Sequence, residues 1–192
     1  MKVMVACEFS GIVRDAFSRM GHDAISCDLL PSDSSGPHII GDIRNISLSE
    51  YDLLIAFPPC THLSVSGARW FKDKQNEQQE ALEFIRFLLN APVPKIALEN
   101  PVGIISTRIR KPDQIIQPWQ FGHPESKRTC LWLKNLPPLE STNVLELPQK
   151  GYWNNQTPSG QNRLGPSPNR WKDRSRTYEG IAQAMSEQWG VL

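Results

Sequence analysis

The chain has 192 residues, of which 39% are hydrophobic and 21% are charged. This length and composition are those of one globular α/β domain with a real core, and they argue against two full domains. The formal net charge of +1 excludes a global electrostatic attraction to nucleic acid or to a membrane surface.

The first forty residues predict a strand, a helix and two further strands. Residues 2–6 (KVMVA) are a short apolar run typical of a buried strand, without the long apolar region and cleavage site of a signal peptide. Residues 12–20 carry apolar side chains at the spacing of one helical face, and Gly21 is a helix stop. Residues 24–27 and 38–40 are the next predicted strands.

The middle of the chain continues this alternation. Residues 52–57 (DLLIAF) predict a buried strand, residues 76–90 an amphipathic helix, and residues 95–98 another strand. Strands that alternate with helices predict a doubly wound, mostly parallel sheet covered on both faces, which is a Rossmann-like α/β fold. No apolar stretch is long enough to span a membrane.

The last third of the chain has a different composition. Residues 128–134 (RTCLWLK) predict one more strand, and residues 179–189 predict a closing helix. Between them, residues 136–178 are rich in Pro, Asn and Gly and then basic, so we expect an irregular segment within a single domain of residues 1–192. Five cations and one carboxylate between residues 161 and 178 suggest an anionic partner or a solvated basic loop, and charge alone leaves both open.

Polar and small residues directly follow the predicted strands. In chain order they are Phe9-Ser10-Gly11, Asp28, Asp42, Pro58-Pro59-Cys60 and Glu99-Asn100. Because ligands of such sheets bind beyond the carboxyl ends of the strands, we expect these residues to gather in one site. A glycine turn lets a ligand approach the next helix, and carboxylates can bind a ribose and a purine. Taken singly, Gly11, Asp28 and Asp42 are equally typical of ordinary turns.

Cys60 is the most specific of these candidates. The four cysteines, at positions 7, 27, 60 and 130, include no CxxC pair, which argues against a disulfide framework or a zinc knuckle and suits a reducing cytosol. Two prolines stiffen the turn before Cys60, so a thiolate there would be presented from rigid backbone, as covalent catalysis requires. Glu99 is placed to share the pocket as an acid or a hydrogen-bond partner.

The sequence allows two other interpretations of Cys60. Cys60 could be a small buried apolar residue, as we expect of the other three cysteines. His62 lies two residues further on, so a cysteine–histidine pair or a metal site is conceivable. The four histidines show no ligand spacing, so we expect no metal.

Five stretches match, in order, the motifs of a single enzyme family. They are Phe9-Ser10-Gly11 for an F-[AS]-G opening, Asp28 and Asp42 for acidic cofactor contacts, Pro58-Pro59-Cys60 with Ser64 and Gly67 for a P-P-C loop, Glu99-Asn100 for an E-N pair, and Lys127-Arg128-Thr129 for a Q-R-x-R segment. The sequence thus resembles the DNA cytosine-C5 methyltransferases. The resemblance covers about residues 3–133, with a weaker match near residues 174–190.

The resemblance implies a Rossmann-like S-adenosylmethionine-dependent methyltransferase fold. It implies transfer of a methyl group from S-adenosylmethionine to C5 of cytosine in DNA, through a covalent adduct with Cys60, and catalytic roles for Cys60, Glu99 and Arg128. The implied cofactor-binding residues are Phe9, Ser10, Gly11, Asp28, Asp42 and Pro58. The implied substrate-binding residues are Ser64, Asn100, Lys127, Arg174 and Arg176.

The sequence has no counterpart of a separate target-recognition domain, because residues 136–175 are too short and irregular. DNA is therefore the expected partner, with a second protein as a candidate for target recognition, and no membrane partner is expected. The basic stretch from Arg163 to Arg176, with Trp153 and Trp171 nearby, could bind phosphates and stack on bases, or the tryptophans could pack against the body. The compact size is associated with phages and mobile elements, which would place the protein in the cytoplasm, the host's if phage-encoded.

Two alternative functions remain open from the sequence. Val13 stands where the family usually has a second glycine, and this favours the same cytosine activation with another electrophile or with a free nucleotide. The other alternative is a non-catalytic DNA-binding module with a degenerate methyltransferase fold. The presence of both Cys60 and Glu99 argues against that module, because a decayed site needs neither group.

Overall fold

The structure, a computed structural model, describes residues 1–64, 74–160, 162–165, 167–168 and 170–192. Its centre is a seven-stranded sheet in the order β3-β2-β1-β4-β5-β7-β6. The strands are β1 (Lys2–Ala6), β2 (Asp23–Asp28), β3 (His38–Ile40), β4 (Leu53–Ala56), β5 (Lys95–Pro101), β6 (Gln114–Ile116) and β7 (Thr129–Lys134). Strands β1 to β5 pair in parallel, and β7 runs antiparallel to its neighbours β5 and β6.

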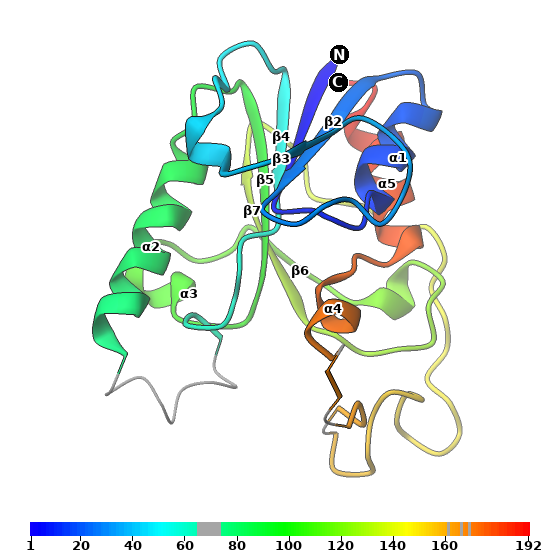
Figure 1. Cartoon of the computed structure of the whole chain (residues 1–192). Coiled ribbons are helices and arrows are strands. Elements are labelled where there is room, and N and C mark those ends of the chain that lie inside the picture. Colours follow the sequence, from blue (N-terminus) through cyan, green and yellow to red (C-terminus); the bar gives the residue numbers. More distant parts are fainter. Residues whose placement is uncertain (65–73, 161, 166, 169) are drawn as a thin grey trace.

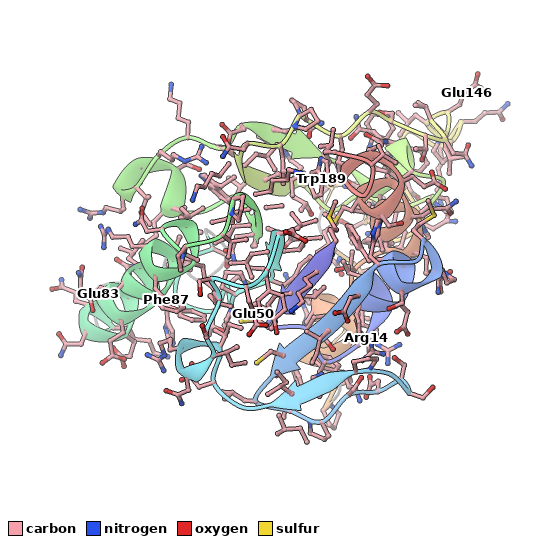
Figure 2. The ribbon with its side chains drawn as sticks, turned by 90° about the horizontal axis from the view of Figure 1, so that it is seen from above. Arg14, Glu50, Glu83, Phe87, Glu146 and Trp189 are labelled. Carbon is pink, nitrogen blue, oxygen red and sulfur yellow. The ribbon has the colours of Figure 1, made fainter. Side chains whose placement is uncertain are left out.

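Helices cover both faces of this sheet (Figure 1). They are α1 (Ile12–Arg19), α2 (Gln75–Leu89), α3 (Ile105–Arg108), α4 (Arg170–Ser175) and α5 (Glu179–Trp189), with 3-10 turns η1 (Ile43–Asn45) and η3 (Pro118–Gln120). Figure 2 shows the layers from above, with Glu83 and Phe87 on the α2 side and Arg14 and Trp189 on the other. Among the described residues, no helix is long and apolar enough to cross a membrane.

The core explains why the strands are apolar throughout. Successive side chains of a strand point to opposite faces, and in β1 Val3 and Val5 pack with α1 and α5 while Met4 and Ala6 pack on the α2 side. All four are fully buried, as expected of a strand covered on both faces. The predicted doubly wound, mostly parallel α/β fold is confirmed.

The sequence interpretation was wrong about the end of β5. We expected a strand over residues 95–98 followed by Glu99-Asn100, but β5 continues to Pro101. Pairing with the antiparallel strand β7 extends it, since Glu99 lies opposite Leu131 and Asn100 opposite Cys130. Glu99 and Asn100 are therefore held within the sheet, and their side chains have a more rigid base than a loop would give.

The described residues between β7 and α4 form no helix and no strand of the sheet, and Figure 1 shows them as irregular chain, yellow to orange. Local contacts hold this segment to the body. The rings of Trp119 and Trp153 stack with centroids 6.1 Å apart, and Asn155 exchanges hydrogen bonds of 3.0 and 2.8 Å with the backbone of Ser126. Trp153 is buried, so this tryptophan packs against the body, as one of the two interpretations expected.

Candidate active site

The loop after β4 presents Cys60 at the carboxyl edge of the sheet. The Asn100 side chain of β5, fully buried, donates a hydrogen bond of 2.8 Å from Nδ2 to the carbonyl oxygen of Pro58. The Cys60 carbonyl oxygen accepts hydrogen bonds of 3.0 Å from the amides of Leu63 and Ser64, which closes a tight turn. The loop is thus fixed on both sides of the half-buried thiol.

The other end of this turn is bound to the chain that follows β5. Ser64, which is buried, forms an isolated β-bridge with Gly103, and the Ile104 amide donates to the Leu63 carbonyl at 2.9 Å. A Cβ atom on Gly103 would lie 2.1 Å from the Leu63 carbonyl oxygen. Only glycine permits this close backbone approach, so Gly103 sets the distance between the thiol loop and the end of β5.

Charged groups of both signs surround the thiol. Burial raises the pKa of Cys60, and the carboxylate of Glu99 raises it further, whereas the positive charges of Arg174 and Lys127 lower it. The balance leaves the pKa of Cys60 above its ordinary value, so the group is a thiol at neutral pH. Two cations nevertheless lie close enough to favour a thiolate when the proton is removed.

Glu99 faces a small space that it shares with Phe57, the residue after β4, and with α5. Burial raises the pKa of Glu99, against the opposing effects of Lys127 and of a hydrogen bond with Thr129. A cavity of about 10 Å³, enough for at most one water molecule, is lined by Glu99, Lys127, Thr129 and Tyr178 among others. A carboxyl group with a raised pKa can serve as a proton donor near neutral pH.

A larger cavity of about 260 Å³ lies beyond the carboxyl ends of β1, β2 and β3. Asp28, Asp42, Arg44 and Pro59 contribute to its wall, with a mainly apolar remainder from Leu29, Ile43 and Phe84. Pro59 precedes Cys60 directly, so the cavity reaches the thiol loop. It contains Asp28 and Asp42 of the predicted cofactor residues, and Pro59 rather than Pro58 faces it.

The two carboxylates in this wall differ in what they already bind. Asp42 accepts from Arg44 through Nε at 3.0 Å, Nη2 at 2.5 Å and the backbone amide at 2.9 Å, and these hydrogen bonds lower the pKa of Asp42. Asp28 uses Oδ1 to accept from the Leu30 amide at 3.0 Å. Asp28 therefore has more acceptor capacity left for a ligand than Asp42 has.

The Phe9-Ser10-Gly11 turn is buried and lies outside the wall of either cavity. Glu8, which the sequence interpretation missed, fills the N-terminus of α1 in place of a ligand. Its carboxylate accepts hydrogen bonds from the amides of Val13 at 2.7 Å and Arg14 at 3.3 Å. These amides are therefore already satisfied. An acidic residue within reach of a helix start was the available signal.

The remaining predicted residues fall into two groups. Lys127 and Arg174 lie near Cys60, and Lys127 Nζ donates to the Arg174 carbonyl at 3.0 Å. Arg176 instead pairs with Asp33 at 2.7 Å, and Arg128 is exposed and acts electrostatically on Cys130. Within the described ranges, no three His, Cys, Asp or Glu side chains form a group that could hold a metal ion.

Solved structures that are similar to this chain include the two proteins that follow. Neither a scan against protein-family models nor a search of curated proteins finds a match. The chain is similar to a protein provisionally assigned as a DNA modification methyltransferase encoded within an E. coli prophage, at 14% identity over 69% of this chain and 46% of that one, with a TM-score of 0.46. It is also similar to a mutant of Spodoptera frugiperda DNMT2, at 16% identity over 77% of this chain and 55% of that one, with a TM-score of 0.44. The chain spans about half the length of either protein.

Proposed function

We propose that the protein is an S-adenosylmethionine-dependent methyltransferase that acts on C5 of cytosine in DNA. One observation carries the proposal: a thiol and a carboxyl group with a raised pKa interact at the carboxyl edge of neighbouring strands, and the thiol loop borders a nucleoside-sized cavity. The ordered match of sequence motifs to the cytosine-C5 family supports the same function.

The larger cavity fits the nucleoside part of the cofactor. Leu29, Ile43 and Phe84 offer apolar surface to a purine ring, and Asp28 has acceptor capacity for ribose hydroxyls. The 260 Å³ volume is below the usual range for whole small-molecule sites, so the rest of the cofactor would extend past Pro59 toward Cys60. When bound, S-adenosylmethionine supplies an electrophilic methyl group on a sulfonium.

The residues at the thiol end have the roles that cytosine activation requires. The C6 atom of cytosine is electron-poor, so the Cys60 thiolate adds there while the protonated Glu99 donates a hydrogen bond to N3. Electron density moves to C5, which becomes nucleophilic and accepts the methyl group. A base then removes the C5 proton, the C5–C6 double bond reforms, and the Cys60 thiolate leaves. Lys127 and Arg174 favour the thiolate in both the attacking and the leaving step.

DNA would reach this edge beside α4. Trp171 is 54% exposed, and its neighbours in sequence include Lys172 and Arg174, so the helix offers both an aromatic face and positive charge. In a duplex the target base must leave the stack, at a cost of a few kcal/mol. The proposal includes a second protein that would select the target sequence in DNA.

Nucleoside mass spectrometry of DNA from cells that express the protein tests the proposed function. We expect deoxycytidine with one added methyl group in cells with the wild-type protein and with Cys130→Ala, a control thiol buried in β7. Cys60→Ser should abolish the product. Methylated cytosine in the Cys60→Ser sample, or none with the wild type, would contradict the proposal. A cytosine product of another mass would favour a different electrophile.

A further inference from the structure

The basic segment at the C-terminal end is bound to a single carboxylate. Asp33, in the loop between β2 and β3, accepts a hydrogen bond from Lys172 Nζ at 2.7 Å through Oδ1 and one from Arg176 Nη2 at 2.7 Å through Oδ2. Lys172 and Arg176 stand on either side of Arg174 in the sequence. One carboxylate therefore holds the backbone that carries Arg174 from both sides.

Asp33 is itself joined to the turn after β1. Its amide donates to the Phe9 carbonyl at 2.8 Å, and the Phe9 side chain contacts α4. The Trp171 ring lies 5.8 Å from the Phe9 ring, centroid to centroid, and Lys172 Nζ lies 5.5 Å from the Phe9 centroid. Helix α4 thus rests on Phe9 and Asp33 together, beside the lower ends of the strands in Figure 1.

The opposite side of α4 reaches the thiol end of the site. Lys127 Nζ donates to the Arg174 carbonyl at 3.0 Å, and Lys127 shares the small cavity with Glu99. A six-residue helix is too short to be stable alone, so its position depends on these tertiary contacts. The two hydrogen bonds of Asp33 are the ionic part of that attachment.

We propose that Asp33 is a positioning residue: by holding Lys172 and Arg176 it fixes α4, and thereby keeps Arg174, whose carbonyl binds Lys127, within electrostatic range of Cys60. This rests on the proposed function only for the catalytic use of Cys60, because the placement itself does not depend on the reaction. Without Asp33, α4 loses its ionic attachment and Arg174 moves away from the thiol.

The positioning role and a direct electrostatic role of Asp33 have opposite signs. The negative charge of Asp33 acting directly would disfavour the thiolate, so its removal would lower the pKa of Cys60. Loss of the nearby cation would instead raise the pKa of Cys60, because Arg174 favours the thiolate. The direction of the change therefore distinguishes the two roles.

The test is the rate of Cys60 alkylation by iodoacetamide as a function of pH, with the modified peptide identified by mass spectrometry. We expect Asp33→Asn to move the midpoint to higher pH and to slow alkylation at pH 7.5 by about two- to fivefold, since only the thiolate reacts. Arg174→Gln should do the same, and the double variant should show no further change. Asp33→Glu should keep the wild-type pH profile, because it keeps the carboxylate. Asp23→Asn removes the same charge at the amino end of β2 and should also keep the wild-type profile.

A midpoint that is unchanged or lower in Asp33→Asn would overturn the proposal, as would an unchanged profile in Arg174→Gln. If Asp33→Asn does not fold, the pair Lys172→Gln and Arg176→Gln tests the same attachment from the other side: the midpoint should rise, and it should not rise when Arg174→Gln is already present, whereas a direct charge effect would persist. If the variants shift the midpoint as expected but the wild-type protein transfers no methyl group, the proposed function is contradicted and the positioning role stands.

Discussion

At the scale of single residues, the proposed role of Glu99 comes with a cost in stability. Glu99 lies in β5 and is half-buried, and the loss of water around its carboxyl group raises the pKa of Glu99. A raised pKa means that the folded protein binds the proton more tightly than the unfolded chain does. The charged form is therefore disfavoured in the fold, and the stability contribution of Glu99 falls as the pH rises from about 4.5 through the folded-state pKa.

We expect Glu99→Gln to raise the unfolding temperature at pH 7.5, and we expect this gain to shrink toward zero as the pH falls to the unfolded pKa. The same substitution should lower methyl transfer by about 10²-fold or more, because an amide is a weaker hydrogen-bond donor to N3 than a protonated carboxyl group. Thermal unfolding between pH 4.5 and 8 measures the first effect. The exposed Glu146, marked in Figure 2, provides the control substitution Glu146→Gln. A gain of equal size at every pH would show that Glu99 is not a buried titrating group.

The sequence predicted which residues meet at the site better than it predicted their contacts. Cys60 and Glu99 were candidates because a thiol and a carboxyl group are recognisable residue types at strand ends, and the structure brings them within electrostatic range of each other. The bond from Asn100 to the Pro58 carbonyl was not predictable, since a backbone acceptor leaves no mark in the sequence. The Asn100 Oδ1 atom is buried and has no hydrogen-bond partner within the described ranges. The contact that the Asn100 side chain does make, through Nδ2, anchors the thiol loop.

At the scale of elements, the thiol loop depends on a glycine that no motif identified. Gly103 lies where a Cβ atom would collide with the Leu63 carbonyl at 2.1 Å. A side chain there must push the turn of residues 60–64 away from β5. The turn carries Cys60, so the displacement acts on the proposed nucleophile and leaves the core intact.

We expect Gly103→Ala to lower activity by about 10- to 100-fold, the range that a displacement of about 1 Å of a reacting group can cause. Circular dichroism should show unchanged secondary structure. Gly165→Ala is the matched control, because a Cβ atom at Gly165 would meet nothing within 4 Å. Full activity of Gly103→Ala would mean that the thiol loop tolerates movement.

The loop of residues 31–37 is anchored by a buried cation. The Arg14 side chain is fully buried, and its guanidinium donates to Ser26 at 3.1 Å, Ser34 at 2.5 Å and the Ser35 carbonyl at 3.2 Å, with Asp15 as its ion-pair partner. Figure 2 shows Arg14 beside the blue and cyan ribbons on this side of the molecule. Composition predicted the loop correctly, but an arginine on an amphipathic helix looks like a solvent-facing residue.

We expect Arg14→Lys to lower the free energy of unfolding by about 2–4 kcal/mol, because lysine keeps the charge but cannot reproduce the planar set of donors. Urea unfolding followed by fluorescence measures the change. Arg19→Lys, at an exposed position of the same helix, should change stability by less than about 0.5 kcal/mol. An effect of Arg14→Lys as small as that of the control would contradict the anchoring role.

At the scale of the whole molecule, the longer elements were predictable and the shortest ones were not. Apolar runs and helical periods specified β1 to β5 with α1 and α2, and also the antiparallel strand β7 and the closing helix α5. Strand β6 and helices α3 and α4 are too short to show a period. The attachment of α4 joins Asp33 to Lys172 across 139 positions, and an ion pair of that kind appears in a sequence only as two scattered charges.

In the proposed reaction Cys60 forms a bond to cytosine, and a trapping experiment can detect this bond. DNA that contains 5-fluoro-2′-deoxycytidine should trap the protein, because after methyl transfer C5 carries fluorine in place of the proton that must leave. We expect a protein–DNA adduct that resists denaturation and forms only with S-adenosylmethionine. The adduct should map to Cys60 and be absent in Cys60→Ser. A protein that methylates ordinary DNA but forms no adduct, or forms one at another residue, would contradict the proposed reaction.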